Sequence, residues 1–295
     1  MTGTRKGEWC IAVEAFLRGF FPIITVLALN FIPALVALAW SSLFAGLFFG
    51  AVVAYRKLWH ELKSALFWKY VFGVLFFNGI LYYVFYFVGL EYTTPGNASI
   101  VALFEVFTAY LFFNVLRREH FSRAHTIGSI LMLIGALTVV GRDLSGVNIG
   151  DILILGSTCV APLGNLFSRK AREIASSETI MFVRSLAAAL VIFVLAATLG
   201  EHASSSEIWQ GLPFLLINGI LLLGFSKFLW IEAIHRIPVT KANALNSVTP
   251  LLTLLLAWAL LNQSPSIWQL TAVVPMIIGT LLLTDQLPFV SPRIR

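Results

Sequence analysis

The chain has 295 residues, of which 59% are hydrophobic and only 12% are charged, and its formal net charge is +6. Soluble globular domains carry about 25% charged residues, so this composition excludes a soluble protein and predicts an integral membrane protein in a lipid bilayer. The positive charge does not indicate a nucleic-acid partner, because the basic residues are concentrated in the loops on one side of the predicted membrane.

Apolar segments long enough to cross a bilayer follow one another along the whole chain. A hydrocarbon core about 30 Å thick needs about 20 apolar residues per helix. The loops between the segments are short and rich in Pro, Gly, Ser, Asn and charge, so no loop leaves room for a soluble domain. The sequence therefore predicts an all-α membrane protein with ten transmembrane helices, at 9–29, 33–55, 66–90, 95–115, 123–141, 150–168, 178–199, 211–234, 238–261 and 267–285.

The basic residues predict the direction of these helices. With the N-terminus in the cytoplasm, sixteen of the twenty Lys and Arg residues fall in cytoplasmic segments, and one, Arg142, falls in an external loop. Cytoplasmic loops of membrane proteins carry an excess of Lys and Arg. We therefore expect a multi-pass protein of the cell inner (plasma) membrane with both termini in the cytoplasm.

The chain contains an internal repeat. LMLIGAL (131–137) recurs as PMIIGTL (275–281), and EVFT (105–108) corresponds to PLLT (250–253). We interpret this as two five-helix halves, 1–145 and 146–295, and because five is odd, the second must be inverted. Inverted repeats are typical of secondary transporters with a substrate site near the membrane midplane. The tetrapeptide NGIL also occurs twice, at 78–81 and 218–221, but its different offset suggests coincidence or a local shift.

These features resemble the drug/metabolite transporter superfamily, and specifically its EamA-type exporters, over essentially the whole chain. The resemblance lies in the two inverted halves, the short loop before the fourth and ninth helices, the P-x-x-T element at 250–253 and the I-G-x-L elements at 134–137 and 278–281. It implies a central cavity lined by the third, fourth, eighth and ninth helices. It also implies export of amino acids, including aromatic or other hydrophobic ones, or of related small metabolites.

Glu105 departs from the pattern of that family, whose members tend to carry proline at this position in both halves. A charged residue at the centre of a membrane helix costs about 2.5–3.5 kcal/mol on insertion scales. Glu105 is therefore expected either to pair with Lys227 or Arg18 and lock helices together, or to meet the substrate's ammonium group. Glu14 and Arg18 lie four residues apart on the first helix, a spacing that favours a structural ion pair between them.

Polar residues recur at helical spacing on the predicted third, eighth and ninth helices. Polar groups within a bilayer must face protein or water, so these faces predict a cavity, with ordinary helix packing as the alternative for the aromatic members. An amino acid's carboxylate would then meet Lys227 or the Asn243 amide. The predicted substrate-binding residues are Asn78, Tyr82, Tyr86, Glu105, Thr108, Lys227, Trp230, Asn243, Asn246 and Ser247.

Other classes of function are not expected. All five histidines are predicted to lie in loops, and the sequence has no HExxH or P-loop motif, so we expect no enzyme, no metal site and no cofactor. Cys10 and Cys159 are interpreted as buried small hydrophobic residues without a disulfide. A channel would favour rings of like charge, whereas this chain has single, oppositely charged residues within its predicted helices. The prediction is a secondary transporter working by alternating access, with no evident protein partner. The alternatives are an exporter of other metabolites or drugs, and a channel-like or structural membrane protein.

Overall fold

The computed structural model describes residues 3–112, 123–140, 148–284 and 286, and these residues form helices and connecting turns without any strand. Within them, eight helices are long and apolar enough to cross a membrane, and a shorter apolar helix, Ile267–Leu283, follows. The prediction of an all-α, multi-pass membrane protein is confirmed. The eight helices are Gly3–Leu29, Ala34–Tyr55, Ala65–Tyr92, Arg123–Val140, Ile149–Arg172, Ser177–Thr198, Ser205–Arg236 and Lys241–Leu261.

Most of these helices are continuous, but two of the longest contain a π-helical segment. The two copies of NGIL lie in these two segments, so the repeated tetrapeptide marks a feature that both halves share. The continuous helices are α1 (Gly3–Leu29), α2 (Ala34–Tyr55), α7 (Arg123–Val140), α8 (Ile149–Arg172), α9 (Ser177–Thr198) and α14 (Ile267–Leu283). The divided ones are α3 (Ala65–Gly73), η2 (Val74–Leu81) and α4 (Tyr82–Tyr92), and α10 (Ser205–Leu216), η4 (Ile217–Phe225) and α11 (Ser226–Arg236), while η1 (Leu58–Lys63) precedes α3.

The predicted fourth and ninth helices are each broken near their middle. Residues 103–104 form a turn between α5 (Pro95–Ala102) and α6 (Glu105–Tyr110), and residues 247–248 separate α12 (Val239–Asn246) from α13 (Thr249–Leu261). Pro250 is suited to the first turn of α13, where no backbone donor is needed. In the first half Glu105 itself begins α6. Residues 113–115 of the predicted fourth helix lie outside the described residues, so the number of ten helices stays a prediction.

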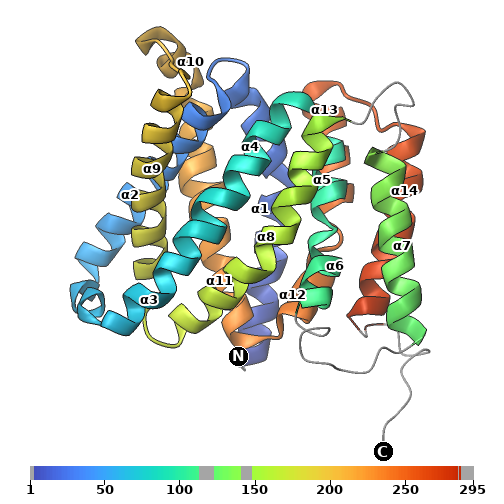
Figure 1. Cartoon of the computed structure of the whole chain (residues 1–295), viewed down its shortest axis with the longest axis horizontal. Coiled ribbons are helices and arrows are strands. Elements are labelled where there is room, and N and C mark those ends of the chain that lie inside the picture. The colour runs from blue at the N-terminus through green and yellow to red at the C-terminus, as the bar shows by residue number, and fades with distance from the viewer. Residues whose placement is uncertain (1–2, 113–122, 141–147, 285, 287–295) are drawn as a thin grey trace, which may run out of the picture.

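Two pairs of helices pack antiparallel at opposite ends of the molecule. Along α2, Gly46 lies against Leu186 of α9 and Gly50 lies against Phe182, so residue numbers rise on one helix as they fall on the other. A Cβ atom at Gly46 would come within 2.9 Å of the backbone nitrogen of Leu186, so this small residue permits the close approach. Helices α7 and α14 pack in the same antiparallel way (Figure 1). Between these pairs, α4 packs on α8 and α1 packs on α11.

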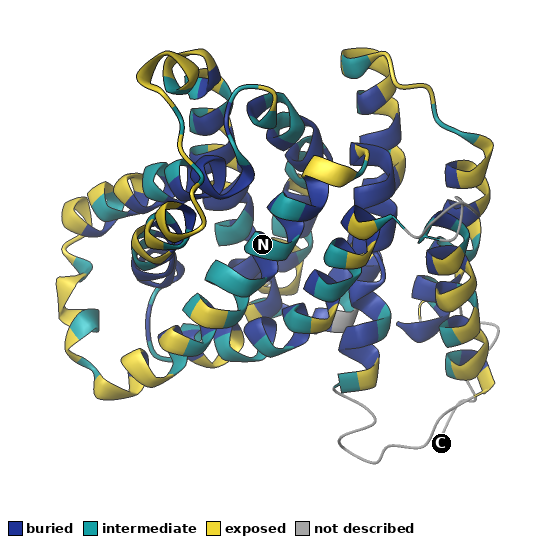
Figure 2. Cartoon of the chain, turned by 45° about the horizontal axis from the view of Figure 1, so that its top comes forward, coloured by how far each residue is buried: buried dark blue, intermediate teal, exposed yellow. Residues whose placement is uncertain are grey.

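Polar groups are buried inside the molecule, and large apolar side chains cover much of its outside. Figure 2 shows the buried residues gathered towards the interior and the exposed ones towards the outside and the helix ends. Glu14 is 0% exposed, whereas Leu190 and Val194 on α9 are 62% and 64% exposed. This distribution suits a lipid environment, in which apolar side chains face the acyl chains and ionisable groups face the protein interior.

Both cysteines differ from their prediction, because Cys159 is exposed and Cys10 is only partly buried. Three histidines also differ from their prediction, since His125 and His235 lie near the ends of α7 and α11 and His60 lies in η1, while His120 lies outside the described residues.

Candidate functional site

Glu105 lies at the centre of the molecule and is ion-paired to Arg18. The Arg18 Nη2 donates to Glu105 Oε2 at 3.2 Å, and the Nδ2 of Asn165 donates to Oε1 at 3.0 Å. The Glu105 residue is only 6% exposed. A buried carboxylate needs such partners for both oxygens, because an isolated one is very costly in a low dielectric. The sequence analysis expected either Lys227 or Arg18 as the partner of Glu105, and in the structure the partner is Arg18.

Glu14 does not form the expected intrahelical pair with Arg18. Its Oε1 lies 3.8 Å from Lys227 Nζ, and its Oε2 accepts a hydrogen bond from Asn246 Nδ2 at 2.6 Å. The difference has a physical reason: each carboxylate gains both a cation and an amide donor from other helices, which an i,i+4 pair would not supply. The two ion pairs therefore join α1 to α6 and α1 to α11.

Asn165 on α8 connects three of the predicted residues. Its Oδ1 accepts hydrogen bonds from Trp230 Nε1 at 3.0 Å and from Asn78 Nδ2 at 3.3 Å, while its Nδ2 binds Glu105. The neighbouring Gly164 makes room for this contact, because a Cβ atom there would lie 2.1 Å from Asn78 Cγ. The sequence analysis missed Asn165. The polar or small residues 157, 161, 164, 165 and 168, spaced along one face of α8, are a signal that could have identified it.

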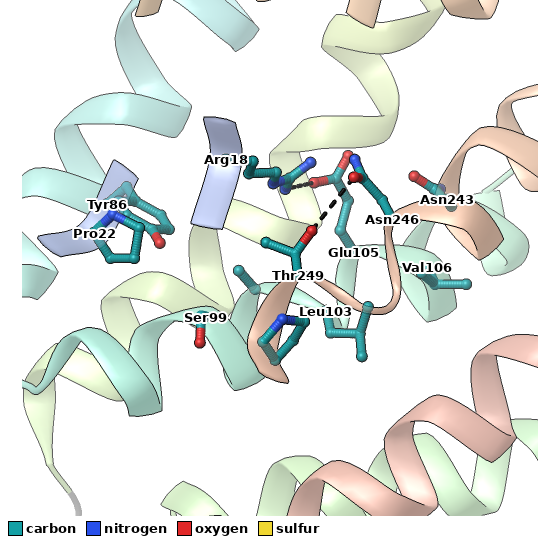
Figure 3. Close-up of a pocket in the computed structure, with 12 residues that line it drawn as sticks. Arg18, Pro22, Tyr86, Ser99, Leu103, Glu105, Val106, Asn243, Asn246 and Thr249 are labelled. Atoms are coloured by element: carbon teal, nitrogen blue, oxygen red, sulfur yellow. Dashed lines mark hydrogen bonds and ion pairs between the residues drawn. The ribbon is translucent and has the colours of Figure 1, made fainter. Parts of the chain in front are cut away.

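Two small cavities flank the Arg18–Glu105 pair, and both residues line both of them. Each cavity has a volume of about 30 Å³, room for only one or two water molecules. Figure 3 shows the pair at the first cavity, with Tyr86 and Pro22 on one side and Asn246 on the other. Because the ion pair stands between the two cavities, we infer a closed conformation in which it divides a larger polar space.

Most of the predicted substrate-binding residues line these cavities. Tyr86, Asn243 and Asn246 line the first, and Asn78, Tyr82, Lys227 and Trp230 line the second. Thr108 and Ser247 do neither. The Thr108 hydroxyl donates to the backbone oxygen of Thr158 at 2.6 Å, and the Ser247 hydroxyl donates to that of Ala244 at 2.8 Å. Both hydroxyls are therefore engaged by backbone carbonyls rather than turned to a cavity.

Arg184 is a further residue that the sequence analysis missed. It lines the second cavity, is 5% exposed, and donates from Nη2 to the backbone oxygen of Leu223 at 3.4 Å. The sequence analysis considered Glu14, Arg18, Glu105 and Lys227 as the charges inside the membrane and did not include Arg184. The sequence could have identified Arg184, because it is the one charged residue between positions 179 and 199.

Further polar contacts join helices towards the two ends of the molecule. At one end, Asp151 on α8 accepts hydrogen bonds from Thr93 at 2.5 Å and from Asn97 at 3.4 Å. At the end of the molecule that holds the N-terminus, Lys241 binds Glu8 at 2.5 Å. Asp151 follows Glu8 by 143 positions and Lys241 follows Asn97 by 144, offsets that agree to within one position with that of the repeated segments 131–137 and 275–281.

The chain matches a known transporter family twice. The profile of the EamA-like transporter family matches twice, over residues 5–141 and 148–285. The uncharacterized transporter YoaV of Bacillus subtilis (strain 168) is 26% identical over 265 residues, which cover 82% of this chain and 84% of the relative. The uncharacterized transporter YcxC of the same organism is 24% identical over 211 residues, which cover 68% of this chain and 67% of the relative.

A solved crystal structure has the same fold. It superposes with a TM-score of 0.68 at 20% sequence identity, covering 94% of this chain and 96% of the other. The membrane helices, the buried polar centre and both profile matches agree with one another. The chain therefore belongs to the EamA-like transporter family, whose members transport small molecules across membranes.

Proposed function

We propose that this chain is a secondary transporter that exports amino acids or related small metabolites across the inner membrane by alternating access. The observation that carries the proposal is the buried Arg18–Glu105 pair, which lines two polar cavities at once. Ionisable residues within membrane helices typically mark substrate or ion pathways. A pair that only locked helices together would have no need of polar space on both sides.

The size of the cavities implies that the site must open. Neither cavity, at about 30 Å³, holds an amino acid. If Arg18 and Glu105 part, the two cavities merge, and the Glu105 carboxylate becomes available to the substrate's ammonium group. The ammonium then replaces the guanidinium as the counter-charge, so the carboxylate is never left alone in a low dielectric. The aromatic rings of Tyr82, Tyr86 and Trp230 would lie against the substrate's side chain.

The polar contacts towards the two ends of the molecule support a mechanism of alternating access. Breaking the Glu8–Lys241 contact opens the path at one end, and breaking the Asp151 contacts with Thr93 and Asn97 opens it at the other. Because these contacts occupy corresponding positions, the proposal needs two inverted repeats, 1–145 and 146–295, with ten membrane helices in total. The antiparallel packing of α2 on α9 and of α7 on α14 supports this arrangement.

The proposed orientation predicts which loops an external reagent reaches. In a variant without Cys10 and Cys159, we expect Gln263→Cys to react with a membrane-impermeant thiol reagent added to intact cells. Ser122→Cys should react only after the cells are permeabilised, because its loop is basic and cytoplasmic. The opposite pattern of labelling would contradict this orientation, and labelling of both positions from the same side would contradict the inversion of the second half.

A bulky residue in the first cavity should block transport. Asn243 is 4% exposed and lines this cavity, so Asn243→Trp adds more volume than the cavity can accept and should reduce transport at least about tenfold. Thr271→Trp is the matched control, because Thr271 is exposed on α14 and its replacement would face lipid. Membrane expression of both variants should equal that of the wild type. Unimpaired transport by Asn243→Trp would show that Asn243 only packs helices.

The proposed function is tested with a panel of radiolabelled amino acids in proteoliposomes, with and without a pH gradient. We expect saturable flux of at least one amino acid and no flux through empty vesicles. Non-saturable flux would instead favour a channel. Transport restricted to compounds that are not amino acids would favour the alternative of a drug or metabolite exporter.

A further inference from the structure

The second cavity has one cation more than its carboxylates neutralise. Three basic side chains line it: Arg18, Lys227 and Arg184. Arg18 is paired with Glu105, and Lys227 lies 3.8 Å from Glu14. Among the described residues, no carboxylate lies within ion-pair distance of Arg184. The wall of this cavity therefore carries a net positive charge that is concentrated on Arg184.

The contacts of Arg184 leave part of its hydrogen-bonding capacity unused. Its Nη2 reaches one carbonyl, that of Leu223, at 3.4 Å, and its guanidinium carbon lies 5.5 Å from the centroid of the Tyr83 ring. Its Nε is buried and has no hydrogen-bond partner among the described residues. A guanidinium presents five donors in a planar fork that matches a carboxylate. A buried cation without a counter-charge is costly, and Arg184 has no carboxylate partner among the described residues.

The position of Arg184 is fixed by both π-helical segments. Its side chain packs on Gly79 of η2, where a Cβ atom would lie 3.2 Å from Arg184 Cγ, and it donates to Leu223 of η4. π-Helical segments are frequently found at functional sites. Glu105 lines the same cavity as Arg184. A carboxylate and an unpaired guanidinium on one cavity wall are the two groups that a zwitterion requires.

We propose that Arg184 binds the anionic group of the transported solute, so that the substrates are small carboxylates. This inference rests on the proposed transport function and narrows its substrate class. It also changes the expected partner of the substrate's carboxylate. Lys227 is already next to Glu14, and Asn243 lines the other cavity, whereas Arg184 faces the second cavity with donors to spare. For an amino acid, the ammonium group meets Glu105 and the carboxylate meets Arg184.

The test compares matched solutes that differ only in the acid group. Purified full-length protein is reconstituted in phosphatidylcholine vesicles loaded with L-amino acids or with their carboxamides, which keep the ammonium group and the side chain. We expect the wild type to move the acids at least tenfold faster than their carboxamides. Arg184→Gln should lose at least tenfold of the acid flux. Arg184→Lys, which keeps the charge but not the fork, should retain part of it.

Arg56→Gln is the matched control. Arg56 is also an arginine that contacts α9, through Glu178, but it lies at the end of α2 outside both cavities. The Arg56→Gln variant should transport the acids at the rate of the wild type. Equal fluxes of acids and amides in the wild type, or an unchanged preference in Arg184→Gln, would overturn the proposal. A dependence on Arg184 that is seen only when phosphatidylglycerol is added would also overturn it, because the anion would then be a lipid headgroup.

Thermal unfolding separates a binding role from a packing role without any flux measurement. Without solute, Arg184→Gln should unfold at a temperature equal to or above that of the wild type, because it removes a buried unpaired charge. Added L-amino acids should raise the unfolding temperature of the wild type and leave that of Arg184→Gln unchanged. A lower unfolding temperature in the variant, with stabilisation by acids intact, would contradict the site. A wild type that is stabilised by acids but moves none of the solutes would contradict the transport function instead.

Discussion

Glu105→Gln is expected to reduce amino-acid transport about 10- to 150-fold, since a hydrogen bond to a charged group contributes about 1.5–3 kcal/mol. Glutamine keeps the shape of the side chain and removes the charge that the substrate's ammonium group requires. A neutral solute without an amine, if it is transported, should be spared. The measurement is the initial rate of flux in proteoliposomes, normalised to the amount of folded protein.

Two further variants decide whether this loss reports substrate binding. Glu207→Gln is the matched control, because Glu207 lies in the exposed capping box of α10, where glutamine is also suitable, and it should transport normally. In Arg18→Met with Glu105→Gln, neither partner of the pair is left as an uncompensated charge. If the pair only locks helices, this double variant should recover both folding yield and transport. Normal amino-acid transport by the double variant would contradict the role proposed for Glu105.

Glu14→Leu is expected to destabilise the protein by about 3–5 kcal/mol, because it leaves the Lys227 ammonium buried without its carboxylate. It also removes the acceptor of the Asn246 amide, whose hydrogen bond to Glu14 spans 2.6 Å. The effect is measured by thermal or denaturant unfolding of the purified protein in detergent. An unfolding free energy within about 0.5 kcal/mol of the wild type, the range of surface substitutions, would show that Lys227 has another partner.

Removing the lysine as well should recover most of that loss. In Glu14→Leu with Lys227→Met, neither charge remains buried, and apolar replacements of a buried pair are often neutral or stabilising. The single change Lys227→Met completes the double-mutant cycle. Additive effects of the two single changes would contradict an interaction between these residues.

The positions of most helices could be predicted from hydropathy alone. The predicted segments 33–55 and 178–199 differ by one residue at most from Ala34–Tyr55 and Ser177–Thr198. Hydropathy is informative here because every backbone group in lipid must be bonded within its own helix. The break at 103–104 was missed, although the correspondence of Glu105 with Pro250 contained the signal, since the second half breaks just before its proline.

The partners of the buried charges could not be predicted in the same way. Helical spacing places Glu14 and Arg18 on neighbouring turns, but it does not fix how α1 is rotated against α6 and α11. That rotation brings Arg18 to Glu105 and Glu14 to Lys227. Asn165 and Arg184, by contrast, are polar residues within apolar helices that sequence reasoning could have included. Their omission left the cavity without its central amide and without its unpaired cation.

We propose that, as the site opens, the Glu105 carboxylate separates from the Arg18 guanidinium and binds the substrate's ammonium group in its place. The most direct test is counterflow in proteoliposomes, in which vesicles filled with an unlabelled amino acid take up the same labelled amino acid, compared with its N-acetyl derivative. N-acetylation removes the positive charge and keeps the carboxylate and side chain. The wild type should accumulate the free amino acid and not the derivative, and Glu105→Gln should lose this discrimination. Equal counterflow of the two compounds in the wild type would contradict this proposal.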